Sequence, residues 1–284
     1  MLKEDFIIVD AIRTHVVQAG TGKPLLLIHG LGGPQMWQRV IEPIAKSFRV
    51  IAIDLPGFGD SDCPPAPYST EEYAVFLDHL LSILNIPRVM VAGISYGGHI
   101  ALVFAHQFRQ RVEKLVLIAS TGLRSPNWFA KDNFCWMLFS LLMKHTILRS
   151  RTALEFLSRE SFFDLNNRPA NLVESFHRQL SQPGKRDAWL SVLRNVFVPQ
   201  PNLRCLLSLP DCPPDRSGYG WAGAICHSTL LLWGANDRAV PPRVAEDFHR
   251  LIPHSMLKII PECAHSVPLE KPEETCEEII NFVY

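Results

Sequence analysis

The sequence predicts an α/β fold, in which a doubly wound, mostly parallel β-sheet is covered by helices on both faces and carries an inserted helical cap. Three observations lead to this prediction. Short apolar runs alternate with helical patterns over the first 121 residues, strand patterns then vanish until about residue 199, and an apolar run resumes at 230–233. The chain has 284 residues, 47% of them hydrophobic and 20% charged, which is enough for a large buried core.

The first part of the chain predicts a hairpin followed by a βαβ unit. Residues 6–9 and 14–17 form two short apolar patterns, typical of paired strands. Residues 25–28 are a continuous apolar run, as expected of a strand buried on both faces of a parallel sheet. A helical spacing over 34–45 begins with a proline, which the first turn of a helix tolerates, and residues 50–53 form the next strand.

The remaining elements keep the same alternation. Ser69 and Glu72 have the spacing of a capping box before a helix at 73–84. The elements expected after it are a strand at 89–92, a helix at about 98–107 and a strand at 114–118, then a strand at 230–233, a helix at 241–251, a strand at 256–260 and a helix at 272–282. Strands that alternate with helices pair in parallel.

Two units follow from this order. We expect a sheet core made of residues 1–121 and 229–284, and between them, at 122–228, a helical cap with an irregular connection. Residues 204–227 show no clear periodicity and are expected to form an irregular loop or to mark an irregularity of the sequence. The cap is rich in aromatic residues, about half of which should pack its interior while the rest line an apolar pocket above the sheet: Trp128, Phe129, Phe134, Trp136, Phe139, Phe156, Phe162, Phe163, Phe176, Trp189 and Phe197.

Composition and charge exclude several classes of protein. The formal net charge is zero, with no basic stripe, so no nucleic-acid partner is expected. The longest apolar stretch, residues 134–143, is about half as long as a membrane-spanning helix, so we expect a buried or interfacial helix and no stable membrane insertion. Seven scattered cysteines and no apparent secretory signal predict free thiols in the cytoplasm, and no metal-ligand spacing is present.

Residues 93–97 read Gly-Ile-Ser-Tyr-Gly and match the G-x-S-x-G pattern. The match falls where an apolar strand meets a helix, which is the context that the chemistry of this motif needs. A turn this sharp holds its serine in a strained conformation and exposes the hydroxyl, while crowding leaves no room for a side chain at Gly93 or Gly97. The sequence therefore predicts Ser95 as a nucleophile.

A serine nucleophile needs a base, and the base needs an orienting acid. Among eleven histidines, His265 is the best placed, because it follows the strand at 256–260 at the carboxyl edge of the sheet, where active sites of open α/β folds gather. Asp237 follows the strand at 230–233 at the same edge. Asp54 also ends a strand and is the competing acid, although its loop favours a structural role as a cap of backbone amides.

The oxyanion formed during acyl transfer needs two N–H donors. One is expected from the backbone of Tyr96, directly after the nucleophile, and the other from the backbone of Leu31 in the loop at 29–33. His29, Gly30 and Gly32 are expected to support that loop, the glycines by letting the main chain approach the substrate.

Together these motifs resemble those of the α/β-hydrolase fold family, in its serine-nucleophile branch. The resemblance covers roughly residues 5–121 and 229–284, and the quoted motifs occur in the family order Ser–Asp–His. It implies a serine hydrolase that cleaves carboxylic esters of fairly apolar, small-molecule substrates through an acyl-enzyme, without metal or organic cofactor, as a monomer or homodimer.

The resemblance leaves alternatives open. Dehalogenases and epoxide hydrolases of the family carry Asp at the position of Ser95. The C–C bond hydrolases of meta-cleavage-type diketones usually have Asn before the serine and Trp after the histidine, where this chain has Ile94 and Ser266. These hydrolases, cofactor-free perhydrolases and a ligand receptor with a slow triad remain alternatives to a carboxylesterase.

Overall fold

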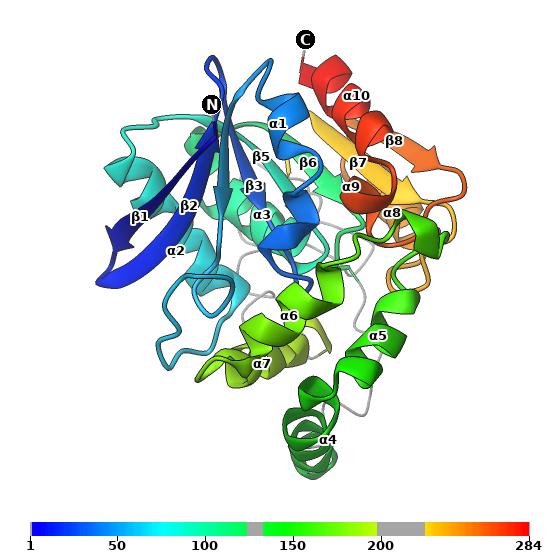
Figure 1. The fold of residues 1–284 in the computed structure, drawn as a ribbon. Coiled ribbons are helices and arrows are strands. Elements are labelled where there is room, and N and C mark those ends of the chain that lie inside the picture. The colour runs from blue at the N-terminus through cyan, green and yellow to red at the C-terminus, as the bar shows by residue number, and fades with distance from the viewer. Residues whose placement is uncertain (1, 124–132, 198–224, 284) are drawn as a thin grey trace.

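The computed structural model describes residues 2–123, 133–197 and 225–283. Within them lies an eight-stranded sheet with the strand order β1-β2-β4-β3-β5-β6-β7-β8 (Figure 1). Its strands are β1 Lys3–Val9, β2 Ile12–Ala19, β3 Pro24–Ile28, β4 Arg49–Ile53, β5 Val89–Ile94, β6 Val112–Ile118, β7 Thr229–Gly234 and β8 Ser255–Ile260. The structure thus confirms the predicted doubly wound, mostly parallel α/β sheet.

The direction of each strand follows the predicted order. β1 and β2 form the expected antiparallel hairpin, and β2 continues antiparallel to β4. From β4 onwards every neighbouring pair is parallel. The central strands are buried along most of their length, as their uninterrupted apolar sequences require.

Helices cover both faces of the sheet, and each face has its own apolar cluster. The first face packs against α2 Thr70–Ile83, α3 Tyr96–Gln107 and α8 Pro242–Leu251. The second packs against the 3₁₀ turn η1 Pro34–Trp37 and against α1 Ile41–Ile44, α9 Val267–Glu270 and α10 Pro272–Val283. Alternate residues of one strand contribute to opposite clusters, as Leu26 and Leu27 of β3 show.

The start of α2 follows its sequence pattern, whereas residues 34–45 depart from theirs. The capping box is present, because Ser69 accepts a hydrogen bond from the Glu72 amide while the Glu72 carboxylate accepts one from the Ser69 amide. The single helix predicted over 34–45 is wrong, since the structure has η1 and the short α1 instead. Pro43 explains the break, because its ring excludes a carbonyl four residues earlier and allows a helix only from Ile41 onward.

A group of helices lies between β6 and β7 in the chain and forms a layer beside one edge of the sheet (Figure 1). It consists of α4 Asn133–His145, η4 Ile147–Arg149, α5 Arg151–Arg159, η5 Leu165–Asn167, α6 Leu172–Ser181 and α7 Lys185–Phe197. All of them except η5 contribute to a separate apolar cluster. We call these helices the cap. The unit boundaries at 121 and 229 stay predictions. Of the irregular stretch expected at 204–227, residues 204–224 lie outside the described residues.

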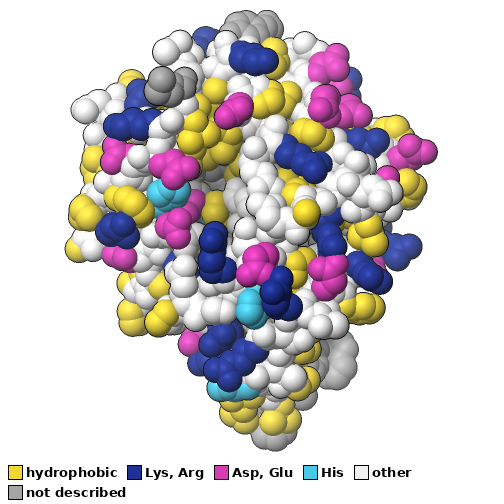
Figure 2. Space-filling view, viewed as in Figure 1, with side chains coloured by type: hydrophobic (Ala, Val, Ile, Leu, Met, Phe, Trp, Pro, Cys, Tyr) yellow, Lys and Arg dark blue, Asp and Glu magenta, His cyan; other side chains and the backbone are white. Residues whose placement is uncertain are grey.

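The cap helix α4 is apolar on its buried face and on its exposed face. Trp136 and Met143 are buried, whereas its outer face exposes Met137, Leu138, Leu141 and Leu142. Figure 2 shows apolar side chains at the tip where Figure 1 places α4, while charged side chains of both signs are scattered over the rest of the visible face. No helix among the described residues is long and apolar enough to cross a membrane.

Candidate active site

Ser95 stands at the turn between β5 and α3. Its backbone has φ 56° and ψ −120°, a left-handed conformation that is costly for a residue with a side chain. The turn is held from outside, because the Ser95 amide donates to Ile118 O at 2.9 Å and Ser95 O accepts from the Thr121 amide at 3.1 Å. A Cβ at Gly93 would lie 2.3 Å from Gly97 O, so the turn tolerates no side chain there.

His265 and Asp237 are hydrogen bonded to each other. The His265 Nδ1–H donates to Asp237 Oδ2 at 2.8 Å, which leaves Nε2 as the free ring nitrogen. The other carboxylate oxygen of Asp237 accepts from the amides of Ala239 and Val240, both at 2.9 Å. Asp237 is only 3% exposed, so its orientation is fixed on both sides by buried hydrogen bonds.

Ser95 and His265 line the same cavity, which has a volume of about 380 Å³. The Ser95 hydroxyl makes no hydrogen bond within the described part of the chain, and active-site hydrogen bonds are commonly long before substrate binds. The structure therefore brings the three residues predicted as a triad to one place, with the histidine–aspartate half already formed.

The loop after β3 forms one wall of this cavity, with Leu31 and Gly32 among its lining residues. It is a tight turn, closed by a hydrogen bond from the Gly33 amide to Gly30 O at 3.0 Å. A Cβ at Gly30 would lie 2.9 Å from the Ser95 Cβ, so glycine is what lets the loop approach the elbow. The close contact places the Gly30 backbone against the elbow, and Leu31, the next residue, lines the same cavity as Ser95.

His29 supports the loop from beneath. Its Nδ1–H donates to Gly30 O at 2.8 Å, and its Nε2 accepts from the Leu55 amide at 3.1 Å. The two roles require a neutral ring, and complete burial lowers the pKa of His29 in the same direction. His29 thus braces the main chain and leaves no ring nitrogen for a reacting group.

Tyr96 directs its side chain away from the cavity. The ring is buried, and its hydroxyl donates to Tyr68 O at 2.9 Å. Burial raises the pKa of this phenol well above its usual range, so it stays protonated. Any part that Tyr96 plays at the elbow falls to its backbone N–H, at the first turn of α3.

The cavity is lined mainly by cap residues and is strongly apolar. None of the described residues that line it is Lys, Arg, Asp or Glu. Its polar groups are Ser95, His265, Gln35, Thr121, Ser158, Ser161 and Ser266, and its apolar walls include Ile94, Met36, Leu148, Leu154, Leu157, Phe162, Leu172, Val173, Phe176, Trp189, Leu193, Val196 and Phe197. Four of the aromatics predicted from the sequence are among them, while Phe156 and Phe163 are exposed.

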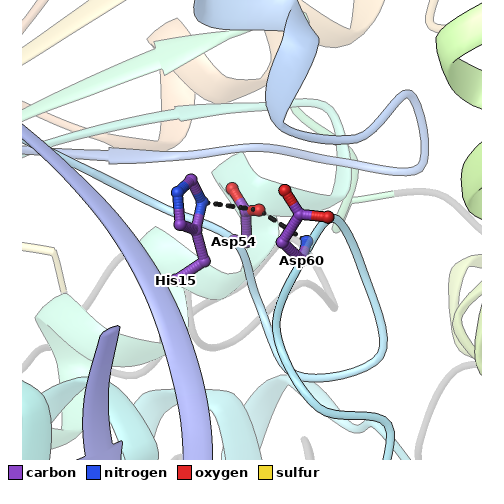
Figure 3. Close-up of side chains that lie close together, drawn as sticks. All are labelled: His15, Asp54 and Asp60. Atoms are coloured by element: carbon purple, nitrogen blue, oxygen red, sulfur yellow. Dashed lines mark hydrogen bonds and ion pairs between the residues drawn. The ribbon is translucent and has the colours of Figure 1, made fainter. Parts of the chain in front are cut away.

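Asp54, the competing acid, belongs to a different cluster (Figure 3). Its Oδ2 accepts from His15 Nδ1 at 2.9 Å and from the Asp60 amide at 2.8 Å. In the described part of the chain, His15, Asp54 and Asp60 have side-chain ligand atoms within 4.8 Å of one another, as a metal site requires. Two hydrogen bonds already occupy the central oxygen, so the contacts present are those of a loop brace.

A sequence model described as alpha/beta hydrolase fold matches residues 23–272 of the chain. The chain belongs to the α/β-hydrolase fold family. This α/β-hydrolase is 32% identical over 269 residues to an uncharacterized protein of Mycobacterium tuberculosis, in an alignment that covers 87% of the chain and 71% of the relative.

Two further similar proteins are hydrolases of different kinds by name. The chain is 27% identical over 271 residues to the 2-hydroxy-6-oxo-2,4-heptadienoate hydrolase of Pseudomonas putida, covering 93% of the chain and 90% of the relative. It superposes on a thermophilic esterase from Thermogutta terrifontis with a TM-score of 0.77 and 26% identity, covering 99% and 98% of the two chains. The protein is therefore a hydrolase, and its substrate has to be argued from the site.

One residue of this α/β-hydrolase that the sequence pattern did not single out is Glu270, at the end of α9. Its buried carboxylate accepts from the Ala264 amide at 2.7 Å, next to His265. The other oxygen accepts from the amides of Phe163 and Asp164 in the cap, at 2.6 and 2.8 Å. Glu270 therefore ties the histidine loop to the cap, and nothing in its local sequence indicates partners 106 and 107 residues away.

Two neighbouring contacts strengthen the same junction. The Ser266 amide donates to Ser161 O at 2.9 Å. Arg39 donates to Asn167 O at 2.7 Å and to Leu269 O at 2.6 Å, so one guanidinium bridges the cap and the segment after His265. The position after the histidine thus serves cap attachment through its backbone as well as lining the cavity.

Proposed function

We propose that this α/β-hydrolase cleaves carboxylic esters with apolar acyl or alcohol groups through an acyl-enzyme on Ser95. The observation that carries the proposal is the apolar cavity over Ser95 and His265, whose described lining has no ionised acid or base apart from the histidine itself. Such a cavity favours an uncharged substrate, because a charge taken from water would find no partner there.

The mechanism assigns one role to each residue. Ser95 Oγ attacks the ester carbonyl while His265 Nε2 takes its proton, and Asp237 stabilises the resulting imidazolium through Nδ1. The backbone amides of Leu31 and Tyr96 donate to the oxyanion. The imidazolium then protonates the leaving alcohol, and water, activated by His265 in the same way, releases the acid and restores Ser95.

Cleavage of a C–C bond in a meta-cleavage-type diketone is the second candidate. The 27% sequence identity with the heptadienoate hydrolase, in an alignment over 93% of the chain, supports it. Against it stand Ile94 and Ser266 beside the nucleophile and the base, and a described lining without a cation for the substrate's carboxylate. The ester proposal is therefore preferred.

Hydrolysis of p-nitrophenyl esters from acetate to octanoate, compared with a dienoate diketone, tests the proposal. We expect steady turnover of the esters and a loss of at least about 10⁴-fold in kcat for Ser95→Ala. Ser181→Ala, on the exposed end of α6, is the matched control and should equal the wild type. Turnover of the diketone without esters would establish the second candidate, and one product released per molecule would identify a ligand receptor with a slow triad.

A cytoplasmic location is part of the same proposal, on the pattern of scattered cysteines. Cys63, Cys226, Cys263 and Cys276 form no disulfide within the described part of the chain.

A further inference from the structure

The cap helix α7 is bonded to Leu31 O, beside one donor of the proposed oxyanion hole, and to Tyr68 O, the carbonyl that anchors the side chain of the other donor residue, Tyr96. We propose that α7 completes this hole, with Trp189 positioning the amide of Leu31 and Asn195 positioning that of Tyr96. The inference rests on the proposed function, because it concerns the same site. It means that catalysis requires the cap to be packed against the sheet core. It also adds two positioning residues, Trp189 and Asn195, to the triad.

The first contact holds the loop after β3. The Trp189 indole N–H donates to Leu31 O at 3.1 Å, across 158 residues of sequence. Three of the four residues at 30–33 are glycines, whose backbones are the freest of any residue, so the loop needs fixed hydrogen bonds to hold one conformation.

Other carbonyls of this loop are held by its own neighbours. Gly30 O accepts from His29 and from the Gly33 amide, and Gly32 O accepts from the Gln35 side chain. Leu31 O is instead held by the cap. Fixing that carbonyl fixes the plane of the Leu31–Gly32 peptide. It thereby restrains the backbone of Leu31 from its C-terminal side, while the Gly33-to-Gly30 hydrogen bond restrains the turn around it.

The second contact reaches the Tyr96 side chain through the carbonyl of Tyr68, and Asn195 also bonds the Tyr96 side chain directly. The Asn195 side-chain amide donates to Tyr68 O at 2.9 Å, and the Tyr96 hydroxyl donates to the same oxygen at 2.9 Å. Tyr68 has φ 54°, a conformation that persists only where its surroundings impose it. Asn195 also donates to Pro67 O at 3.0 Å, so α7 fixes the carbonyl on which the Tyr96 ring is anchored.

The start of α7 is anchored in the core as well. Lys185 is 3% exposed, and its Nζ donates to Phe58 O at 3.1 Å and to Ser61 O. The Trp189 ring meets Phe176 of α6 edge-on, with centroids 6.4 Å apart, and both rings line the cavity. A substrate in the cavity therefore touches the same indole that holds Leu31, which links substrate contact to the geometry of the hole.

Trp189→Phe tests the first contact, because it keeps an aromatic ring and removes the N–H. We expect kcat for a p-nitrophenyl ester to fall about tenfold while KM changes by less than about threefold. The rate at which a short-chain fluorophosphonate labels Ser95 should fall by the same factor, because its phosphonyl oxygen uses the same donors. A change confined to KM, or an unchanged labelling rate, overturns the proposal.

An isosteric replacement separates the hydrogen bond from packing. Site-specific 3-benzothienylalanine at 189 replaces the indole N–H by sulfur at nearly constant shape and should reproduce the Trp189→Phe loss. The same replacement at Trp37, a buried indole whose N–H has no hydrogen-bond partner among the described residues, is the control and should change neither rate. Equal effects at the two sites would refute the assignment, and this pair decides the question if Trp189→Phe fails to fold.

Asn195→Ala tests the second contact, with Ser191→Ala as its matched control. Ser191 donates to Pro67 O at 2.7 Å from the same helix but does not bond Tyr68 O. We expect the labelling rate to fall severalfold for Asn195→Ala and clearly less for Ser191→Ala, and equal losses would overturn this half of the proposal.

Failure of the proposed function gives a different result. If the wild type is labelled by fluorophosphonate but turns over no ester, the ester substrate is refuted. The ratio of labelling rates between variant and wild type then still tests the role of α7. A wild-type Ser95 that resists labelling overturns both.

Discussion

Replacement of Asp237 by asparagine should abolish catalysis while leaving the fold intact. The carboxylate makes three hydrogen bonds, with Oδ1 accepting two backbone amides at 2.9 Å and Oδ2 accepting His265 Nδ1–H at 2.8 Å. An asparagine must keep its single oxygen toward the two amides, because the reverse orientation would place its NH₂ against two N–H donors. The NH₂ group then faces His265 and forces the tautomer that carries its proton on Nε2.

A histidine in that tautomer cannot accept the Ser95 proton. The wrong tautomer costs a serine triad about 10⁴-fold in kcat, equivalent to about 5.4 kcal/mol of barrier. We expect this loss in p-nitrophenyl ester hydrolysis, with KM nearly unchanged and a thermal unfolding midpoint close to that of the wild type, since both amides keep their acceptor.

Asp54→Asn is the matched control for this experiment. Asp54 is equally buried and hydrogen bonded, but its partners are His15 and Asp60, and its replacement should lower stability and leave kcat within about threefold. An Asp237→Asn enzyme within tenfold of the wild type, or an Asp54→Asn enzyme that loses as much as Asp237→Asn, would refute the reasoning.

Three further predictions follow from contacts described above. Glu270→Gln leaves at least one of three backbone amides without an acceptor, so the free energy of unfolding in urea should fall by about 1–3 kcal/mol together with kcat, and an unchanged unfolding midpoint would contradict the role of Glu270. Gly30→Ala places a Cβ 2.9 Å from the Ser95 Cβ, so ester turnover and fluorophosphonate labelling should both drop at least about tenfold, and wild-type rates would show that the loop can yield. The hydrogen bond that His15 donates to Asp54 raises the pKa of His15 above its ordinary value, so protonated His15 stabilises the fold fully below pH 6.5 and that contribution is lost as pH rises through the raised pKa. The loss of stability in His15→Gln should therefore be larger at pH 5.5 than at pH 8.5, and a loss that grows with pH would reverse the sign.

The sequence was informative wherever a local pattern determines a local structure. The apolar runs located the strands, Ser69 and Glu72 located the start of α2, and the Gly93–Gly97 spacing located the elbow. The carboxyl-edge rule then selected His265 and Asp237, which the fold brings within hydrogen-bond distance. In each case the responsible forces act over a few residues or follow from strand order.

Contacts between distant segments could not be predicted in the same way. In the sequence Trp189 is one aromatic among many in the cap, and nothing near it indicates that its N–H donates to Leu31 O. Glu270 lies just before the acidic first turn of a helix, where its sequence favours exposure to solvent, yet it is buried against the cap. At 34–45 the decisive signal is local. Pro43 interrupts the helix there and outweighs the helical spacing of the surrounding apolar residues.

The junction built by Glu270, Arg39 and Ser161 bears on how this enzyme could be re-engineered. Exchanging the cap between hydrolases is an attractive route to new substrates, since most of the cavity wall belongs to it. Here the segment at 161–167 supplies backbone partners to Glu270, Ser266 and Arg39, around the loop that carries His265. A chimera that keeps 161–167 from this chain preserves those partners, whereas one cut at the ends of the cap replaces them and alters the base together with the pocket.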